Sequence, residues 1–337
     1  MEALFAVIAA VALLCQGGTA GAVAMETVVV GDAGNSGELS GAGAGGSGPD
    51  RVCGGVGYNY RIGKYEVTAG QYCDFLNHKA ATDTYGLYNT WMSSNSYGCK
   101  IERSGSSGGY TYSVASDWAN RPVNFVSYWD SLRFANWLNN GQGDGDTETG
   151  AYTLNGYNGS DGREIQRNPG ATWILPTEDE WYKAAYYKGG VNAGYWDYPT
   201  QSDSTPSNLV VDPDPGNNAN YFASTWCIGS PYFRTNVGEF ENSESAYGTF
   251  DQGGNIWEWN EAMVHQDVNY GVLRGGSLDW NYGVSYMLAS TRVGWSPLTE
   301  DYAIGFRVAA AVPEPSSLLC LSVGGLGLLF GRTRRRA

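Results

Sequence analysis

The sequence predicts a single α+β domain with little regular secondary structure. Glycine is abundant, at 48 of 337 residues, and only 16% of the chain is charged. This composition favours turns and short strands, because glycine costs about 1 kcal/mol relative to alanine inside a helix. Three helix starts are marked by capping sequences. Prolines interrupt the chain after residue 186, at positions 199, 206, 213, 215 and 231. Helices should therefore flank a loop-rich β region, with no domain break between residues 51 and 311.

The N-terminal residues predict an export signal. An apolar stretch from Ala3 to Leu14 is followed by small residues that end in Ala22-Val23-Ala24. This pattern is typical of a secretory signal, here residues 1–24, cleaved after Ala24. Glu2 stands where a basic residue is usual, which leaves the position of the start codon open. Because the apolar stretch is short, a buried helix is the alternative to a signal.

A glycine-rich segment, residues 25–55, separates this signal from the main domain. Its centre, residues 31–48, reads GDAGNSGELSGAGAGGSG. Low-complexity glycine and serine sequences commonly form flexible connections, so we expect a loop or linker here.

The first ordered elements follow the linker. Aromatic and β-branched residues over positions 58–67 predict a strand. Three capping boxes predict helix starts, Thr68 with Gln71, Ser127 with Asp130, and Thr177 with Glu180. The aromatic and leucine residues on one face of the first two helices are expected in the core: Tyr72, Phe75, Leu76, Leu132, Phe134, Trp137 and Leu138.

Charge and cysteine content limit the possible ligands. Acidic residues outnumber basic ones 34 to 20, a net charge of −14, which argues against nucleic acid as a partner. The body of the chain contains Cys53, Cys73, Cys99 and Cys227 with no C-x-x-C element, so a zinc site is not expected. An oxidising compartment permits disulfides, and three pairings are possible among which the sequence does not choose.

The C-terminus combines three features. Residues 312–317 read VPEPSS, an apolar run covers 318–330, and arginines stand at 332, 334, 335 and 336. An apolar run followed by arginines orients a membrane segment with its tail in the cytoplasm, and an ordinary anchor is one alternative. Residues 312–337 resemble the PEP-CTERM sorting signal. The resemblance implies export by a Gram-negative bacterium, an inner-membrane anchor, removal by an exosortase near Pro313-Glu314-Pro315, and a final place at the cell surface or in the extracellular matrix.

Six stretches of the body occur in a recognisable order. They are RIGKYEVTAGQYCDFLN (61–77), RPVNFVSYWDSLRFANWLN (121–139), WILPTEDEWYKAAY (173–186), YGTFDQGGNIWEWNE (247–261), LRGGS (273–277) and IGFRVA (304–309). This succession resembles the formylglycine-generating enzyme family, also called the sulfatase-modifying factor domain. The resemblance places that domain at residues 56–311 and implies a fold related to C-type lectin-like domains.

The resemblance also implies where catalysis would occur. Enzymes of the family oxidise a substrate cysteine to formylglycine with oxygen and copper, which is held by two cysteines after the glycine-glycine-serine turn. Those positions fall on Trp280 and Ser285, which are poor ligands for Cu(I). Between Gly275 and Arg307 there is no cysteine or histidine, so copper is not expected. Ser277 is retained, without a base beside it, and is expected to serve the tight turn.

Calcium is the metal that the resemblance favours. Its ligands would be Asp251, the carbonyls of Gly254 and Ile256, and Glu258, a set of hard oxygen donors that suits Ca²⁺. A capped turn with a solvated carboxylate is the alternative. A second family site would use Asn220, the Tyr221 carbonyl, Ser230 and the Tyr232 carbonyl. Serine replaces a carboxylate there, which makes this site doubtful.

Two functions remain open from the sequence. The first is a non-catalytic module that binds a glycan or a protein at the cell surface or in exopolysaccharide, with Trp280, Asp279 and Arg274 as candidate ligand contacts. Burial in the core is the alternative for any single tryptophan. The second function is an oxidoreductase that generates formylglycine on exported sulfatases by other means.

Overall fold

The computed structural model describes residues 22–190, 193–266, 268–279, 281 and 283–312. Five short α-helices and two 3₁₀ helices are present within these residues: α1 (Ala69–Lys79), α2 (Trp91–Ser94), α3 (Ser116–Ala119), α4 (Tyr128–Asn139), α5 (Glu178–Tyr186), η1 (Ala42–Ala44) and η2 (Val284–Met287). The strands are β1 (Thr27–Val30), β2 (Glu38–Ser40), β3 (Arg51–Cys53), β4 (Tyr60–Gly63), β5 (Ile101–Ser104), β6 (Thr111–Val114), β7 (Trp173–Ile174), β8 (Trp257–Gln266), β9 (Val268–Arg274), β10 (Val293–Trp295), β11 (Ile304–Phe306) and β12 (Ala309–Ala311).

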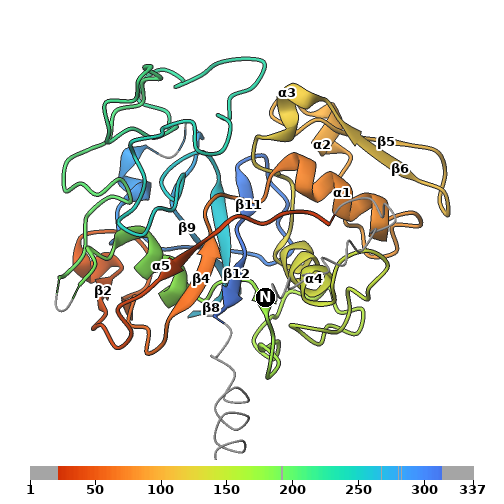
Figure 1. The fold of residues 1–337 in the computed structure, drawn as a ribbon, viewed down its shortest axis with the longest axis horizontal. Helices are drawn as coiled ribbons and strands as arrows, with labels where there is room; N and C mark the ends of the chain where they lie inside the picture. The colour runs from red at the N-terminus through yellow and green to blue at the C-terminus, as the bar shows by residue number, and fades with distance from the viewer. Residues whose placement is uncertain (1–21, 191–192, 267, 280, 282, 313–337) are drawn as a thin grey trace, which may run out of the picture.

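Two four-stranded sheets form the centre of the molecule. The first has the order β1-β4-β12-β7, with every pair antiparallel, and the second has the order β10-β9-β8-β11, in which β11 runs parallel to β8. Helices α1 to α4 and the β5-β6 hairpin lie on one side of the central strands, while α5 and β2 lie on the other (Figure 1). The chain between α5 and β8 consists of turns and loops among its described residues, as the prolines predicted.

The three predicted helix starts are confirmed. Thr68, Ser127 and Thr177 each accept a hydrogen bond from the backbone N–H three residues later, and the side chain at that later position bonds back to the cap residue. These reciprocal bonds satisfy N–H groups that the first turn of a helix leaves unpaired. The strand predicted over 58–67 is shorter, because only Tyr60–Gly63 pairs as β4.

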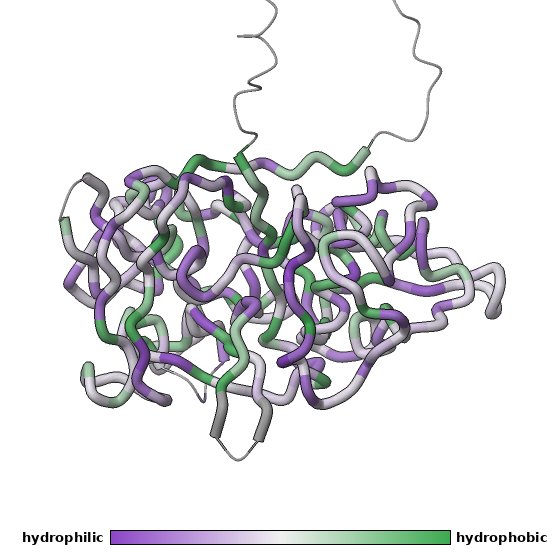
Figure 2. The backbone as a smooth tube through the Cα atoms, turned by 90° about the horizontal axis from the view of Figure 1, so that it is seen from below, coloured by the Kyte–Doolittle hydropathy of each residue, from purple (hydrophilic) through white to green (hydrophobic). Residues whose placement is uncertain are grey.

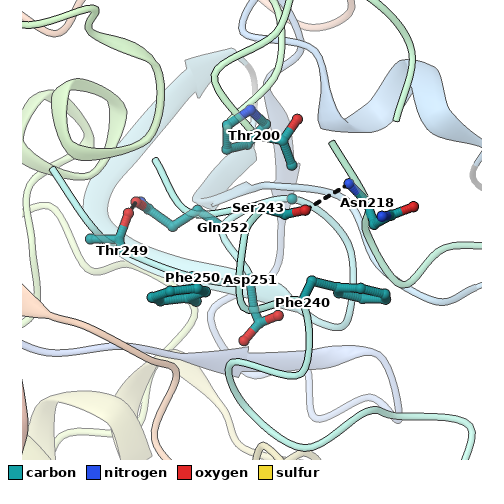
Figure 3. Close-up of a pocket in the computed structure, with 10 residues that line it drawn as sticks. Thr200, Asn218, Phe240, Ser243, Thr249, Phe250, Asp251 and Gln252 are labelled. Carbon is teal, nitrogen blue, oxygen red and sulfur yellow. Dashed lines mark hydrogen bonds between the residues drawn. The ribbon is translucent and has the colours of Figure 1, made fainter. Parts of the chain in front are cut away.

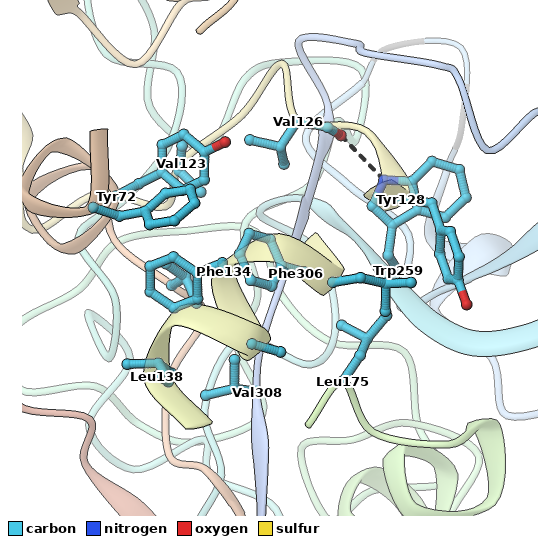
Figure 4. Packing of buried hydrophobic residues seen from close by; sticks show 14 of the residues in the cluster. Tyr72, Val123, Val126, Tyr128, Phe134, Leu138, Leu175, Trp259, Phe306 and Val308 are labelled. Carbon is cyan, nitrogen blue, oxygen red and sulfur yellow. Dashed lines mark hydrogen bonds between the residues drawn. The ribbon is translucent and has the colours of Figure 1, made fainter. Parts of the chain in front are cut away.

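The helix faces predicted to be apolar form the core. Tyr72, Phe75, Phe134 and Trp137 are fully buried, and the Phe75 and Phe134 rings meet edge to face at 5.3 Å. Figure 4 shows this cluster continuing to Trp259 of β8, whose indole N–H donates to the Val126 carbonyl at 3.1 Å. Aromatic rings packed between helices and both sheets therefore join the two halves of the domain.

The prediction of a linker at residues 31–48 is wrong, because this segment is part of the folded domain. Strand β1, just before it, pairs with β4, and β2 within it pairs with β3. The Ser40 side chain is fully buried and donates to the Ala289 carbonyl at 2.7 Å. The glycines here allow close backbone packing: a Cβ on Gly46 would lie 2.1 Å from the Ser290 carbonyl oxygen.

The cysteines and the chain ends complete the description. The four cysteines of the body are all free thiols in the described structure, and three of them are buried. In the described part of the chain, no helix has the length and apolarity needed to cross a membrane. Both ends of the described chain lie on the same side of the molecule (Figure 2). The predicted signal core and the apolar run at 318–330 fall outside the described residues.

Replacing Gly46 by alanine tests whether the 31–48 segment is packed. The new Cβ would collide with backbone at Ser290, so we expect a loss of about 1–3 kcal/mol in the free energy of unfolding, measured by urea denaturation. Gly31→Ala is the matched control, since a Cβ there meets no atom within 4 Å. Equal stability of the two variants would mean that the segment is a linker after all.

Candidate functional site

A buried charge cluster holds the strand that leads into the LRGGS turn. Glu178, the first residue of α5, accepts hydrogen bonds from Arg274 at 2.6 and 2.9 Å and from Arg292 at 2.6 and 2.7 Å. Arg51 of β3 adds a third contact at 3.2 Å. Burial opposes ionisation of Glu178, but the three guanidinium groups outweigh it and lower its pKa to about 2. We call these four residues the Glu178 cluster.

Arg274 is not available to a ligand, which makes its prediction as a ligand contact wrong. Its side chain is fully buried at the end of β9. Besides Glu178, its guanidinium donates to the Ser40 hydroxyl, to the carbonyls of Ala289 and Thr291, and to the Cys53 sulfur. Every donor nitrogen of the group therefore has a protein acceptor.

The turn after β9 is stabilised by contacts within the turn itself. Ser277 is 1% exposed, and its hydroxyl accepts a hydrogen bond from the Asp279 N–H at 3.2 Å. Gly275 and Gly276, with φ of +96° and +71°, adopt left-handed conformations that glycine accommodates. A hydrogen bond from a backbone N–H to a serine hydroxyl two residues earlier is a contact that stabilises tight turns.

The predicted ligand-binding residues of this segment differ in their exposure. Asp279 is 4% exposed, and its carboxylate accepts from the backbone and side-chain nitrogens of Asn281 at 2.9 and 3.0 Å. It also hydrogen-bonds the Tyr302 hydroxyl, whose pKa is raised by burial and by this carboxylate. Ser285 is exposed in η2. Trp280 lies outside the described residues.

The predicted calcium loop lies against the second sheet. Glu258 of β8 is fully buried, and its carboxylate accepts two 2.6 Å bonds from Arg307 and one 2.7 Å bond from the Trp181 indole N–H. A carboxylate offers about four acceptor positions, so one position remains for a further donor or a cation. The carbonyl-bearing residues Gly254 and Ile256 are buried in the same loop.

Asp251 is the carboxylate of this loop that accepts fewer hydrogen bonds. It points away from Thr200 and Ser243 in Figure 3, and Oδ2 accepts one bond, 2.6 Å, from the Gly238 N–H. Burial raises its pKa to about 6, although Gly238 and Arg307 partly oppose this. The cavity drawn beside it has a volume of about 10 Å³, room for roughly one water molecule and no organic ligand.

Glu66, which the sequence reasoning missed, adds a third buried carboxylate nearby. It is 1% exposed, its Oε2 accepts from Asn255 at 3.1 Å, and its Oε1 has no hydrogen-bond partner within the described residues. Burial raises its pKa well above the usual value, and the charges of Asp251 and Glu258 add to the shift. Arg307 offsets the charges of all three carboxylates and Arg234 that of Glu66, and an added cation would stabilise the ionised forms further. The signal was a glutamate in the short segment between β4 and the capped start of α1.

The second predicted calcium site is not assembled in the same way. The Asn220 amide donates to the Phe233 carbonyl at 2.9 Å and to Asn255 at 3.0 Å. The Tyr221 carbonyl accepts from Asn208, Ser230 is exposed, and the Tyr232 carbonyl accepts from the Arg234 N–H at 2.6 Å. Over the described ranges, no group of three or more His, Cys, Asp or Glu residues is placed to hold a metal ion.

The fold and this site define a class of protein: an α+β domain with modest regular structure, in which ion pairs around α5 hold a glycine-glycine-serine turn. Residues 49–312 match the Sulfatase-modifying factor enzyme 1-like domain, and the chain belongs to that family. The formylglycine-generating enzyme fold, related to C-type lectin-like domains, is thereby confirmed. Residues 311–336 match the PEP-CTERM protein-sorting motif, which implies export, a C-terminal membrane anchor before processing, and processing by an exosortase.

Several known proteins are similar to this chain. Inactive C-alpha-formylglycine-generating enzyme 2 of Bos taurus is 31% identical over 146 residues, 42% of this chain and 45% of that protein. The chain therefore spans less than half of this relative's length. Treponema denticola variable protein 1 shares the fold with a TM-score of 0.51 and 22% identity, over 87% of this chain and 98% of that one. PvdO from Pseudomonas aeruginosa gives a TM-score of 0.49 and 19% identity, over 85% and 94%.

The Glu178 cluster predicts a specific pH dependence. Because the pKa of Glu178 is lowered from 4.5 to about 2, its ionisation contributes stability above about pH 5 that is lost as the pH falls toward 2. The contribution is about 3 kcal/mol. Glu178→Gln should therefore be less stable than wild type at pH 7 by about 3–5 kcal/mol and should lose less stability on acidification. Urea titrations at several pH values measure both effects.

The control for this variant is Glu102→Gln on the exposed edge of β5, which should change stability by less than about 0.5 kcal/mol. Parallel pH profiles for Glu178→Gln and wild type would contradict the assigned role of Glu178.

Proposed function

We propose that this exported family member is a non-catalytic binding module, which holds a glycan or a protein at the cell surface or in exopolysaccharide. The observation that carries the proposal is a contrast within one segment. The Glu178 cluster and the Ser277 turn hold the end of β9 in place, whereas Trp280 and Ser285 stand at the positions that the family resemblance assigns to two copper-binding cysteines. The segment therefore keeps its supporting contacts, but neither Trp280 nor Ser285 is a suitable ligand for copper(I).

The remaining thiols do not replace that site. Copper(I) needs thiolates, and burial raises the pKa of Cys227 to about 12. Burial also raises the pKa of Cys53, despite the nearby Arg274. Both therefore favour the protonated form at neutral pH. These properties do not favour the alternative function, a formylglycine-generating oxidoreductase acting on exported sulfatases.

The Ser277 hydroxyl does not favour hydrolytic chemistry either. Its contact is with a backbone N–H in the turn, and a serine nucleophile needs an adjacent general base. His78 lies on α1, with its ring 5.9 Å from the core residue Trp137. Support for a binding role thus comes from the aromatic residue at position 280 and from the matrix-associated sorting motif.

Replacing Trp280 by alanine tests the placement of the ligand. Loss of a stacking face should weaken binding of the native matrix polysaccharide at least about tenfold, as measured by affinity electrophoresis. Trp91→Ala is the matched control, because Trp91 is an exposed tryptophan on α2. Unchanged binding by Trp280→Ala would remove this segment as the contact.

We also propose that calcium binds the loop of Asp251, Gly254, Ile256 and Glu258. The surplus of buried carboxylate charge and the acceptor position left on Glu258 support the proposal. Bound calcium would supply positive charge that stabilises this loop, and extracellular modules commonly bind it at about 10⁻⁴ to 10⁻³ M.

Asp251→Ala should abolish the stabilisation that calcium gives. In wild type, calcium at about ten times its dissociation constant should raise the free energy of unfolding by about 1.4 kcal/mol, measured by thermal denaturation with and without the ion. Ser230→Ala, at the doubtful second site, should retain this response. A wild-type protein that gains no stability from calcium would contradict the proposal.

A further inference from the structure

Two hollows lie on the surface beside the start of α5 and β8. The first has a volume of about 370 Å³ and is lined by β3, the 55–58 turn, the start of α5, and Glu261. The second, about 290 Å³, is lined by residues 162–167, Glu261 and Met263. Glu261 of β8 lines both hollows, and we call the two together the Glu261 groove. Each hollow is comparable in size to a small ligand site.

Tyr58 gives the groove an aromatic wall that is fixed in position. Its hydroxyl donates to Glu180 at 2.8 Å, and its ring meets Tyr60 edge to face at 6.3 Å. Nevertheless 50% of the side chain is exposed. A half-exposed ring that is anchored at its polar end is a preorganised surface for contact with an apolar ligand face.

Charged side chains along the groove are already paired. Arg51 donates to both oxygens of Asp179 at 2.8 and 2.6 Å. Arg167 donates to Glu261 at 3.0 Å through two nitrogens and to Glu180 at 2.9 and 3.1 Å. Arg163, which also lines the groove, is paired with Asp161. Asp179 also accepts from the Gly54 N–H and Glu261 from the Tyr152 hydroxyl, so each carboxylate keeps one of its roughly four acceptor positions.

The aromatic ring and the paired charges of the groove favour some classes of ligand over others. An anionic polymer would meet the carboxylates of Asp179 and Glu261 without a free cation to offset them, on a chain with a net charge of −14. A neutral ligand rich in hydroxyl groups would donate to the same oxygens while its apolar face stacks on Tyr58. Gly57 also lines the groove, and a Cβ there would meet no atom within 4 Å outside its two chain neighbours.

We propose that the Glu261 groove binds a neutral saccharide segment, with Tyr58 as the stacking surface and Asp179 and Glu261 as hydroxyl acceptors. The proposal rests on the binding-module function above and adds a second contact, made by residues other than Trp280.

The test uses the exported protein and oligosaccharides cut from the neutral and the uronate-containing fractions of the native matrix polysaccharide. Binding is measured by isothermal titration calorimetry. Wild type should bind the neutral fraction in preference to the acidic one.

Gly57→Gln should block the groove without straining the fold, and Tyr58→Ala should remove the stacking face, each weakening binding at least about tenfold. Tyr58→Phe keeps the ring and should stay within about threefold of wild type. Thermal denaturation checks that each variant is folded.

The outcomes separate this inference from the proposed function. The same loss from Gly57→Gln in wild type and in the Trp280→Ala background supports an independent contact. Loss of binding in Trp280→Ala, with Gly57→Gln and Tyr58→Ala unaffected, overturns the groove and leaves the proposed function standing. Preference for the acidic fraction overturns the groove as well. If wild type binds neither fraction, this inference fails whatever other ligand the module has.

Discussion

The convergence of Arg51, Arg274 and Arg292 on Glu178 is the constraint on which the rest of the structure depends. A buried carboxylate is costly unless its charge is matched and its oxygens are hydrogen-bonded. Here the matching charges come from β3, from the end of β9, and from the residue before β10. The fold can therefore bury Glu178 only when the N-terminal segment, α5 and the second sheet are all in place. This condition makes the glycine-rich N-terminal segment part of the domain.

The same cluster fixes the position of the segment where family enzymes carry out their chemistry. Arg274 ends β9, and the turn through Gly275, Gly276 and Ser277 follows directly. Its donors hold the carbonyls of Ala289 and Thr291, which lie beyond that segment. Both ends of residues 275–288 are thus held by Arg274, which is itself paired with Glu178. A scaffold of this kind tolerates exchange of the residues between its fixed ends.

Local sequence signals predicted part of this structure, and long-range contacts account for the rest. The capping boxes at Thr68, Ser127 and Thr177 join residues three positions apart, so the sequence contains all the information that they need. The role of Arg274 depends on Glu178, 96 residues away, and no periodicity reports that distance. Glycines 31–48 have the composition of a linker, and composition cannot distinguish flexible glycines from glycines that allow close packing. The Glu261 groove was missed because it unites residues from 51–58, 162–179 and 261–263.

The most direct test of the central claim, that this family framework acts without copper chemistry, is a search for the family's reaction product. The exported protein would be incubated aerobically with copper(I) and a cysteine-containing sulfatase peptide, and the peptide analysed by mass spectrometry beside an active family enzyme as positive control. The account predicts that the peptide mass stays unchanged with this protein and shifts with the control. Formation of the formylglycine aldehyde by this protein would contradict the account and establish an enzyme with a different set of ligands.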